Sequence, residues 1–154
     1  MDSVEELRYL VLAAQREGNR TLTGALKEHD LTPSQAEALA VLRDAGRALS
    51  VREIGKRLVC EGGSPSRLMS TLARKGLVET GTDPDDGRAT LLSLTPAGAA
   101  AARKVTEVEQ ALYAGLRLLV DDDQVEAVLP VLRALVATLP AGEALERRIA
   151  DKNR

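Results

Sequence analysis

The sequence predicts a mainly α-helical fold with one small β-hairpin. The 154-residue chain has room for a single domain with one core. Only two residues are aromatic, both tyrosine, so the core must be built from Leu, Val and Ala, which favours packed helices over a sheet sandwich. Most segments repeat apolar residues every three or four positions, and a single region places turn formers between two short apolar runs.

The first two helices are predicted from periodicity and from a start signal. Residues 3–27 carry Val, Leu and Ala at largely helical spacing. Thr32 then offers an N-cap hydroxyl, proline follows at the first helical position, and Gln35 completes a capping box. We expect this second helix to run to Ala45 and to stop at Gly46.

Two shorter helices follow, joined by a glycine-bearing turn. Ser50 begins a second capping-box sequence and a helix to about Leu58. Ser64 and Pro65 begin a third helix that ends at Lys75, with the next glycine suited to the left-handed position after a helix. The segment 60–63 between them predicts a tight turn.

The pattern then changes to that of a hairpin. Residues 77–80 and 90–94 read as two short strands, and Asp86-Gly87 is a strong reversal signal in the charged segment between them. Such a hairpin has an exposed, charged tip.

The C-terminal part predicts two more helices. Thr95-Pro96 caps a long helix to about Val120, and the acidic run 121–123 favours the start of a last one. Pro130 predicts a kink in that helix or a start displaced toward it. The tail after Pro140 is polar, and we expect it to fray.

Composition also limits cellular context. No apolar run reaches the ~18 residues of a membrane span, and the N-terminus lacks a basic-then-apolar secretion signal, so no membrane partner is expected. A single cysteine allows no intrachain disulfide, which indicates the cytoplasm. The net charge of −2 does not by itself suggest nucleic acid, but residues 43–90 hold nine Lys and Arg against seven Asp and Glu.

The order of elements is that of a winged helix-turn-helix lobe, flanked by N- and C-terminal helices. In such a lobe the second helix of the pair lies in the DNA major groove and the hairpin reaches the neighbouring backbone or minor groove. In the helix 64–75, Leu68, Met69 and Leu72 face the core. The opposite face is polar and cationic, with arginines suited to guanine and hydroxyls suited to bases or phosphates. This predicted DNA-binding face consists of Ser64, Ser66, Arg67, Ser70, Thr71 and Arg74.

Five fragments together resemble the MarR (multiple-antibiotic-resistance regulator) family. They are Leu31-Thr32-Pro33-Ser34-Gln35, Ser64-Pro65-Ser66-Arg67, Lys75-Gly76-Leu77-Val78, Asp83-Pro84-Asp85-Asp86-Gly87-Arg88 and Leu94-Thr95-Pro96-Ala97-Gly98. Each is weak alone, but their order and spacing are specific. The resemblance implies one domain over residues 1–154, with a winged-helix lobe at 31–98 and dimerisation helices at 1–30 and 99–154.

The resemblance also implies a function: a transcription regulator, commonly a repressor, that reads a pseudo-palindromic operator as a triangular homodimer and controls efflux, stress or catabolic genes. By position, the face of the helix 64–75 would enter the major groove. Arg88 would be the wing-tip arginine and Asp86 its acidic partner. A homodimer is also expected from the residues, because the small central lobe cannot cover all the Leu and Val of the terminal helices. The alternative is that these helices pack within a monomer.

Members of this family commonly release DNA when a small aromatic or phenolic effector binds, and some respond to cysteine oxidation. Arg8, Tyr9 and Tyr113 are candidates for a ligand pocket, with core or surface roles as the alternative. Cys60 is the single candidate redox thiol, and a buried structural role is its alternative. No cofactor or metal is expected, because His29 is the lone histidine and no Cys/His cluster exists.

Two other function classes remain for comparison. An enzyme lacks support, because the sequence has no Ser/His/Asp set, metal-ligand cluster or glycine-rich phosphate loop. A winged-helix module that binds protein instead of DNA would expect an exposed apolar stripe on the helix 64–75, where this sequence has Ser, Thr and Arg.

Overall fold

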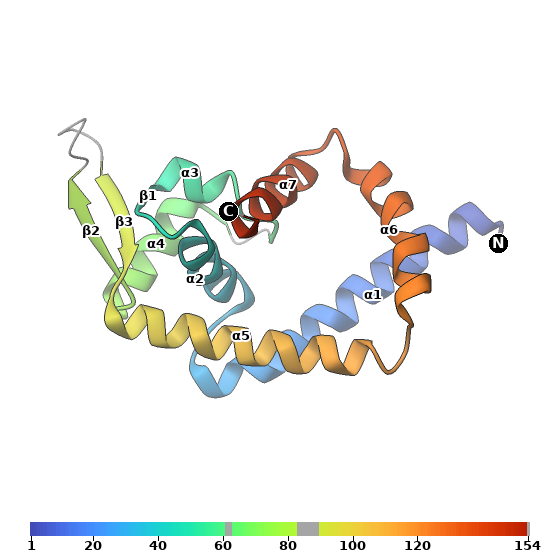
Figure 1. The fold of residues 1–154 in the computed structure, drawn as a ribbon, viewed down its shortest axis with the longest axis horizontal. Coiled ribbons are helices and arrows are strands. Elements are labelled where there is room, and N and C mark those ends of the chain that lie inside the picture. Colours follow the sequence, from blue (N-terminus) through green and yellow to red (C-terminus); the bar gives the residue numbers. More distant parts are fainter. Residues whose placement is uncertain (61–62, 83–89, 154) are drawn as a thin grey trace.

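The computed structural model describes residues 1–60, 63–82 and 90–153, and its architecture is helical with one small sheet (Figure 1). The elements in chain order are α1 (Ser3–Leu26), η1 (Lys27–His29), α2 (Pro33–Ala45), β1 (Leu49–Ser50), α3 (Val51–Gly55), α4 (Pro65–Arg74), β2 (Val78–Thr82), β3 (Thr90–Leu94), α5 (Pro96–Leu116), α6 (Asp122–Val136) and α7 (Pro140–Lys152). This confirms the predicted fold class.

The predicted helix starts are confirmed by their hydrogen bonds. The Thr32 hydroxyl accepts from the Gln35 N–H at 3.2 Å, and the Gln35 side chain accepts from the Thr32 N–H at 3.1 Å. Ser50 and Glu53 form the same reciprocal pair at the start of α3. Each capping box satisfies backbone donors that have no partner within the helix.

Helix α3 is shorter than predicted. It ends at Gly55 and does not reach Leu58, because the chain tightens into turns: the Arg57 N–H donates to the Ile54 carbonyl at 2.9 Å, a bond of three-residue span. The end of α4 agrees with the prediction, since Gly76 adopts the left-handed conformation at φ 70°.

The sheet contains a strand that the sequence did not predict. The two strands of the hairpin pair antiparallel, with Val78 opposite Leu94, and β1 pairs with the other edge of β3, with Leu49 opposite Leu92. The sheet order is β1-β3-β2. At two residues, β1 is too short to show an alternating pattern, so only its partner across the sheet reveals it.

One core holds the lobe together. The largest fully buried side chains come from β1 and from the helices around it, including the end of α1 and the first half of α5. They are Leu26, Leu39, Leu49, Ile54, Met69, Leu72, Val41 and Val105. Burial of so many aliphatic side chains is the main favourable contribution to folding of this lobe, and it fixes α4 against α2 and α3.

The C-terminal helices differ from their predictions in three ways. Helix α5 ends at Leu116 and not near Val120. Helix α6 begins at Asp122 and runs through Pro130, so the displaced start is wrong. The frayed tail is also wrong, because α7 is a helix that packs on α2 and buries Ala144 and Asp151. Its contacts with the lobe are largely ionic, which explains why the segment appears polar in sequence.

Two helices leave their apolar side chains largely uncovered. Helix α1 buries only Leu26, and α6 buries none of its residues. In Figure 1 the exposed half of α1 and the whole of α6 lie at the end of the molecule remote from the hairpin. The exposed apolar residues there are Val4, Leu7, Leu10, Val11, Leu12, Leu116, Leu118, Leu119, Val128, Leu129, Val131, Leu132, Leu135 and Leu139. Across the described residues, no helix has the length and apolarity needed to cross a membrane.

Candidate nucleic-acid interface

Helix α4 is divided into an apolar and a polar side, as predicted. Pro65 occupies its first turn, and Ser64 precedes it in extended conformation without a side-chain capping bond. Leu68, Met69 and Leu72 are 8%, 2% and 0% exposed, which confirms that they face the core. These three anchors determine which side of the helix points away from the protein.

The outward side of α4 brings the predicted DNA-binding residues together. The six predicted residues are Ser64, Ser66, Arg67, Ser70, Thr71 and Arg74. Thr71 is half-buried and the other five are exposed. The Ser70 and Thr71 hydroxyls donate to the helix carbonyls four residues earlier, at 2.9 and 3.0 Å. Their oxygens keep lone pairs with which to accept bonds.

The two arginines of this face are not neutralised by acidic side chains. Arg74 donates to the Thr71 hydroxyl at 3.2 Å. Within the described part of the chain, neither Arg67 nor Arg74 has an acidic partner within ion-pair distance. Lys75, at the end of the helix, pairs instead with Asp30 at 2.9 Å. The face is therefore cationic, and the large apolar side chains of α4 are buried on the opposite side.

The hairpin β2–β3 follows α4 directly, in the position of a wing. Its strands are described up to Thr82 and from Thr90. Asp86 and Arg88, the predicted wing-tip residues, lie outside the described residues, so their role stays a prediction.

Cys60 lies between α3 and α4, close to the start of the DNA-binding face. The residue is exposed, yet desolvation of its thiol in the turn and the nearby Glu37 carboxylate raise the pKa of Cys60 to about 11. A raised pKa keeps the thiol protonated and disfavours the reactive thiolate. The raised pKa argues against a redox thiol, while the exposure of Cys60 does not fit the buried structural role that was its alternative.

The three residues predicted for a ligand pocket do not lie in a shared cavity. The Arg8 guanidinium stacks on its neighbour Tyr9 at 4.6 Å from the ring centre, and both side chains are exposed on α1. Tyr113 lines a recess of about 350 Å³ with Arg43, Arg117 and Lys152, to which Arg8 and Tyr9 do not contribute. Desolvation, which is the larger cause, and the Glu109 carboxylate raise the pKa of the Tyr113 phenol.

No metal centre is found within the described ranges, where no group of three or more His, Cys, Asp or Glu side chains is placed to hold an ion. His29 lies in η1, with Glu28 as its acidic neighbour at 3.7 Å.

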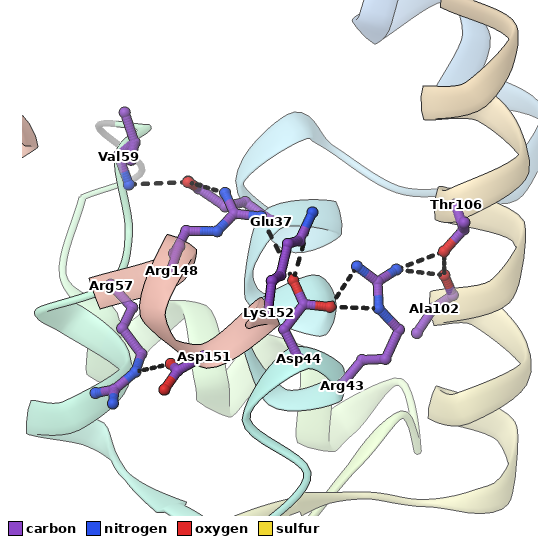
Figure 2. A network of polar contacts seen from close by, with 10 residues as sticks. All are labelled: Glu37, Arg43, Asp44, Arg57, Val59, Ala102, Thr106, Arg148, Asp151 and Lys152. Atoms are coloured by element: carbon purple, nitrogen blue, oxygen red, sulfur yellow. Dashed lines mark hydrogen bonds and ion pairs between the residues drawn. The ribbon is translucent and has the colours of Figure 1, made fainter. Parts of the chain in front are cut away.

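The structure shows a polar network that the sequence reasoning missed (Figure 2). Arg148 of α7 reaches Glu37 of α2 at 3.0 Å, and Arg57 reaches Asp151 at 2.6 Å. Arg148 and Lys152 also approach Asp44, at 4.0 and 3.8 Å. The available signal was Glu37 itself, a charged residue inside an apolar helical run.

On the other side of Asp44 the same network reaches α5. Arg43 pairs with Asp44 at 2.7 Å and donates to the Thr106 hydroxyl and the Ala102 carbonyl. The network thus connects the C-terminal helix with α2, α3 and α5.

A family model supports the placement of this interface. Residues 31–98 match a model described as "Winged helix DNA-binding domain". That stretch runs from two residues before α2 to the first turn of α5, and so contains the complete lobe with α4 and the hairpin.

Characterised relatives and solved structures show the same likeness. The multiple antibiotic resistance protein MarR of Salmonella typhimurium (strain LT2) is 34% identical over 91 residues, which cover 59% of this chain and 62% of that protein. An organic hydroperoxide resistance transcriptional regulator of Bacillus subtilis is 26% identical over 103 residues, covering 67% and 69%. A crystal structure of a MarR mutant from E. coli complexed with operator DNA matches with a TM-score of 0.76 at 27% identity, covering 88% of this chain and 99% of the other.

Proposed function

We propose that the chain is a transcription regulator of the MarR family of winged-helix proteins and that it binds duplex DNA through α4. The observation that carries the proposal is the outward face of α4, where Arg67 and Arg74 lie with exposed serines and, among the residues that the structure describes, have no acidic partner within ion-pair distance. The Bacillus subtilis relative is named as a transcriptional regulator, and no catalytic step is part of the proposal.

The chemistry of this face suits the DNA major groove. An arginine donates two parallel hydrogen bonds to the acceptors of guanine, whereas Ser and Thr hydroxyls reach bases or phosphates. Ser64 and Ser66 stand at the start of α4, where the helix dipole and free backbone N–H groups favour an anion such as phosphate. In this proposal the wing residue Arg88 adds a minor-groove contact oriented by Asp86.

A protein-binding winged helix is the less favoured alternative. It would need an apolar exposed stripe on α4. The large apolar side chains of α4, Leu68, Met69 and Leu72, are instead buried in the lobe.

The proposal includes a homodimer formed by the terminal helices. The uncovered apolar side chains of α1 and α6 form a surface of a size that marks an interface. A two-fold axis through this surface gives two copies of α4, and adjacent major grooves on one side of B-form DNA lie ~34–36 Å apart. The operator would accordingly be a pseudo-palindrome.

We propose further that the protein is a cytoplasmic repressor, and that it releases DNA when a small aromatic or phenolic acid binds. Support comes from the recess beside Tyr113, where Arg43, Arg117 and Lys152 supply cationic groups for a carboxylate or phenolate. Salicylate and benzoate are suitable first probes. If neither compound nor a wider panel of aromatic acids changes DNA affinity, this part is wrong.

The experiment for the main proposal is selection of bound sequences from random duplex DNA by the purified full-length chain. We expect enrichment of a pseudo-palindromic site. Affinity for that site should fall steeply with salt, because cations on the protein displace counterions from phosphates. Absence of any enriched sequence at low ionic strength would contradict the proposal.

A further inference from the structure

Glu37 connects the buried side of α2 to the chain segment that leads into α4. Its side chain is 7% exposed. One carboxylate oxygen accepts from the Val59 N–H at 2.9 Å and the other from the Cys60 N–H at 2.8 Å. A buried carboxylate is costly unless its oxygens are bonded, so these two bonds hold the segment in one position relative to α2.

The C-terminal helix holds Glu37 in turn. Arg148 of α7 donates to the Glu37 oxygen that also accepts from Val59, at 3.0 Å (Figure 2). The Arg148 side chain is 19% exposed, so this ion pair is shielded from solvent. A shielded pair is sensitive to geometry, because removal of one partner leaves the other charge without compensation.

Among the described residues of the segment before α4, Val59, Cys60, Gly63 and Ser64 are exposed, and none of them belongs to the buried core. Pro65, in the first turn of α4, is half-buried and lies near Gly55 of α3. The fully buried apolar side chains of α4 begin at Leu68, one turn into the helix. The bonds at Val59 and Cys60 thus act together with the Pro65 contact in positioning the first turn of α4.

We propose that Glu37 is a positioning residue for the DNA-reading helix, and that Arg148 holds Glu37 so that α7 sets where α4 begins. Glu37 is buried and negatively charged, so it acts through the segment 59–60 and not through contact with DNA. The proposal rests on the proposed function, since it assumes that α4 reads DNA. Sequence-specific binding then depends on the C-terminal helix, whereas binding through phosphates alone does not.

The test compares Arg148→Met, Glu37→Gln and the double variant with the wild type. Two duplexes serve as probes: the one enriched by the wild type from random sequence, and a scrambled duplex of equal length and composition. Lys104→Met is the matched control, because it removes an exposed ion pair with Glu107 on α5. We expect the ratio of specific to non-specific affinity to fall on the order of tenfold in each single variant. The double variant should fall little further, because the two residues act through one contact.

Hydrogen exchange separates positioning from general loss of stability. In folded Arg148→Met, amide protection should fall at Val59 and Cys60 and stay unchanged at Leu39 in the core. Because Arg148→Met keeps the Glu37 carboxylate, it carries the test even if Glu37→Gln fails to fold. An unchanged affinity ratio with unchanged protection at Val59 and Cys60 would overturn the inference. Failure of the wild type to enrich any duplex would instead contradict the proposed function.

Discussion

Gly98 of α5 lies against the backbone of Leu77 so closely that a Cβ on residue 98 would stand 1.8 Å from the Leu77 carbonyl oxygen. Two hydrogen bonds made by Thr95 hold Gly98 and Leu77 in this close approach. The Thr95 N–H donates to the Leu77 carbonyl, and the Thr95 hydroxyl accepts from the Gly98 N–H at 3.0 Å. The start of α5 is thereby joined to the beginning of the hairpin.

Gly98→Ala should destabilise the protein. The added methyl group meets a carbonyl oxygen that belongs to the backbone and cannot rotate away, so we expect a loss of about 3 kcal/mol in the free energy of unfolding. Urea unfolding followed by circular dichroism measures this change. The control is Gly24→Ala in α1, where a Cβ has open space, and it should be neutral or stabilising by up to ~1 kcal/mol. Equal stability of the two variants would show that the close approach at Gly98 is wrong.

Arg57→Met should loosen α7 from the lobe. The variant leaves the Asp151 carboxylate, 7% exposed, without the guanidinium that lies 2.6 Å away. Removal of one partner of a buried pair costs about 3 kcal/mol of unfolding free energy. The exposed Lys104–Glu107 pair provides the comparison, because Lys104→Met should cost less than ~1 kcal/mol. If Arg57→Met and Lys104→Met lose the same unfolding free energy, measured at equal protein concentration, the Arg57–Asp151 pair does not anchor α7.

The Glu53 capping box gives stability a definite pH dependence. The hydrogen bond from the Ser50 backbone N–H, which is the largest cause, and the hydrogen bond from Arg47 lower the pKa of Glu53 from 4.5 to about 2. A lowered pKa in the folded state stabilises the protein above pH 4.5, and this contribution is lost as the pH falls from 4.5 toward 2. Glu53→Ala should therefore be less stable than wild type at pH 7, by about 1 kcal/mol for a lost cap. The difference should shrink toward pH 2, and a constant difference over this range would contradict the lowered pKa.

The Cys60 thiol should react slowly with alkylating reagents at neutral pH. With a pKa raised to about 11, the thiolate fraction at pH 7 is far below that of an ordinary cysteine, whose pKa is about 8.5. The rate of iodoacetamide labelling should rise about tenfold per pH unit up to pH ~10. Because the Glu37 carboxylate contributes to this raised pKa, Glu37→Gln should label faster than the wild type. Fast labelling at pH 7 would revive the redox interpretation of Cys60.

The sequence was sufficient where the determining contacts are local. Thr32 and Gln35 are three residues apart, and their types alone predict the capping box that the structure contains. The polar face of α4 followed from helical spacing, because the positions of Leu68 and Leu72 fix which side faces out. The candidate site follows from the same reasoning that predicts the helix.

Long-range contacts account for what the sequence did not show. Arg148 and Glu37 are separated by 111 positions, and neither residue type at its own position predicts the other. Without that pairing the segment after Pro140 has too few apolar residues to indicate a packed helix. Strand β1 was missed for the same reason, since Leu49 is recognised as a strand residue only through its pairing with Leu92.

Sedimentation velocity of the purified chain with the selected duplex at low salt measures how many chains bind one duplex. We expect one complex that contains two chains per duplex, and its loss in the Arg67→Ala/Arg74→Ala variant, since an arginine that reads a guanine contributes roughly 1–3 kcal/mol. That variant should remain folded and dimeric, because both side chains are exposed on α4 and neither belongs to the uncovered apolar surface of α1 and α6. A wild-type chain that sediments as a monomer and leaves the duplex free would contradict the account.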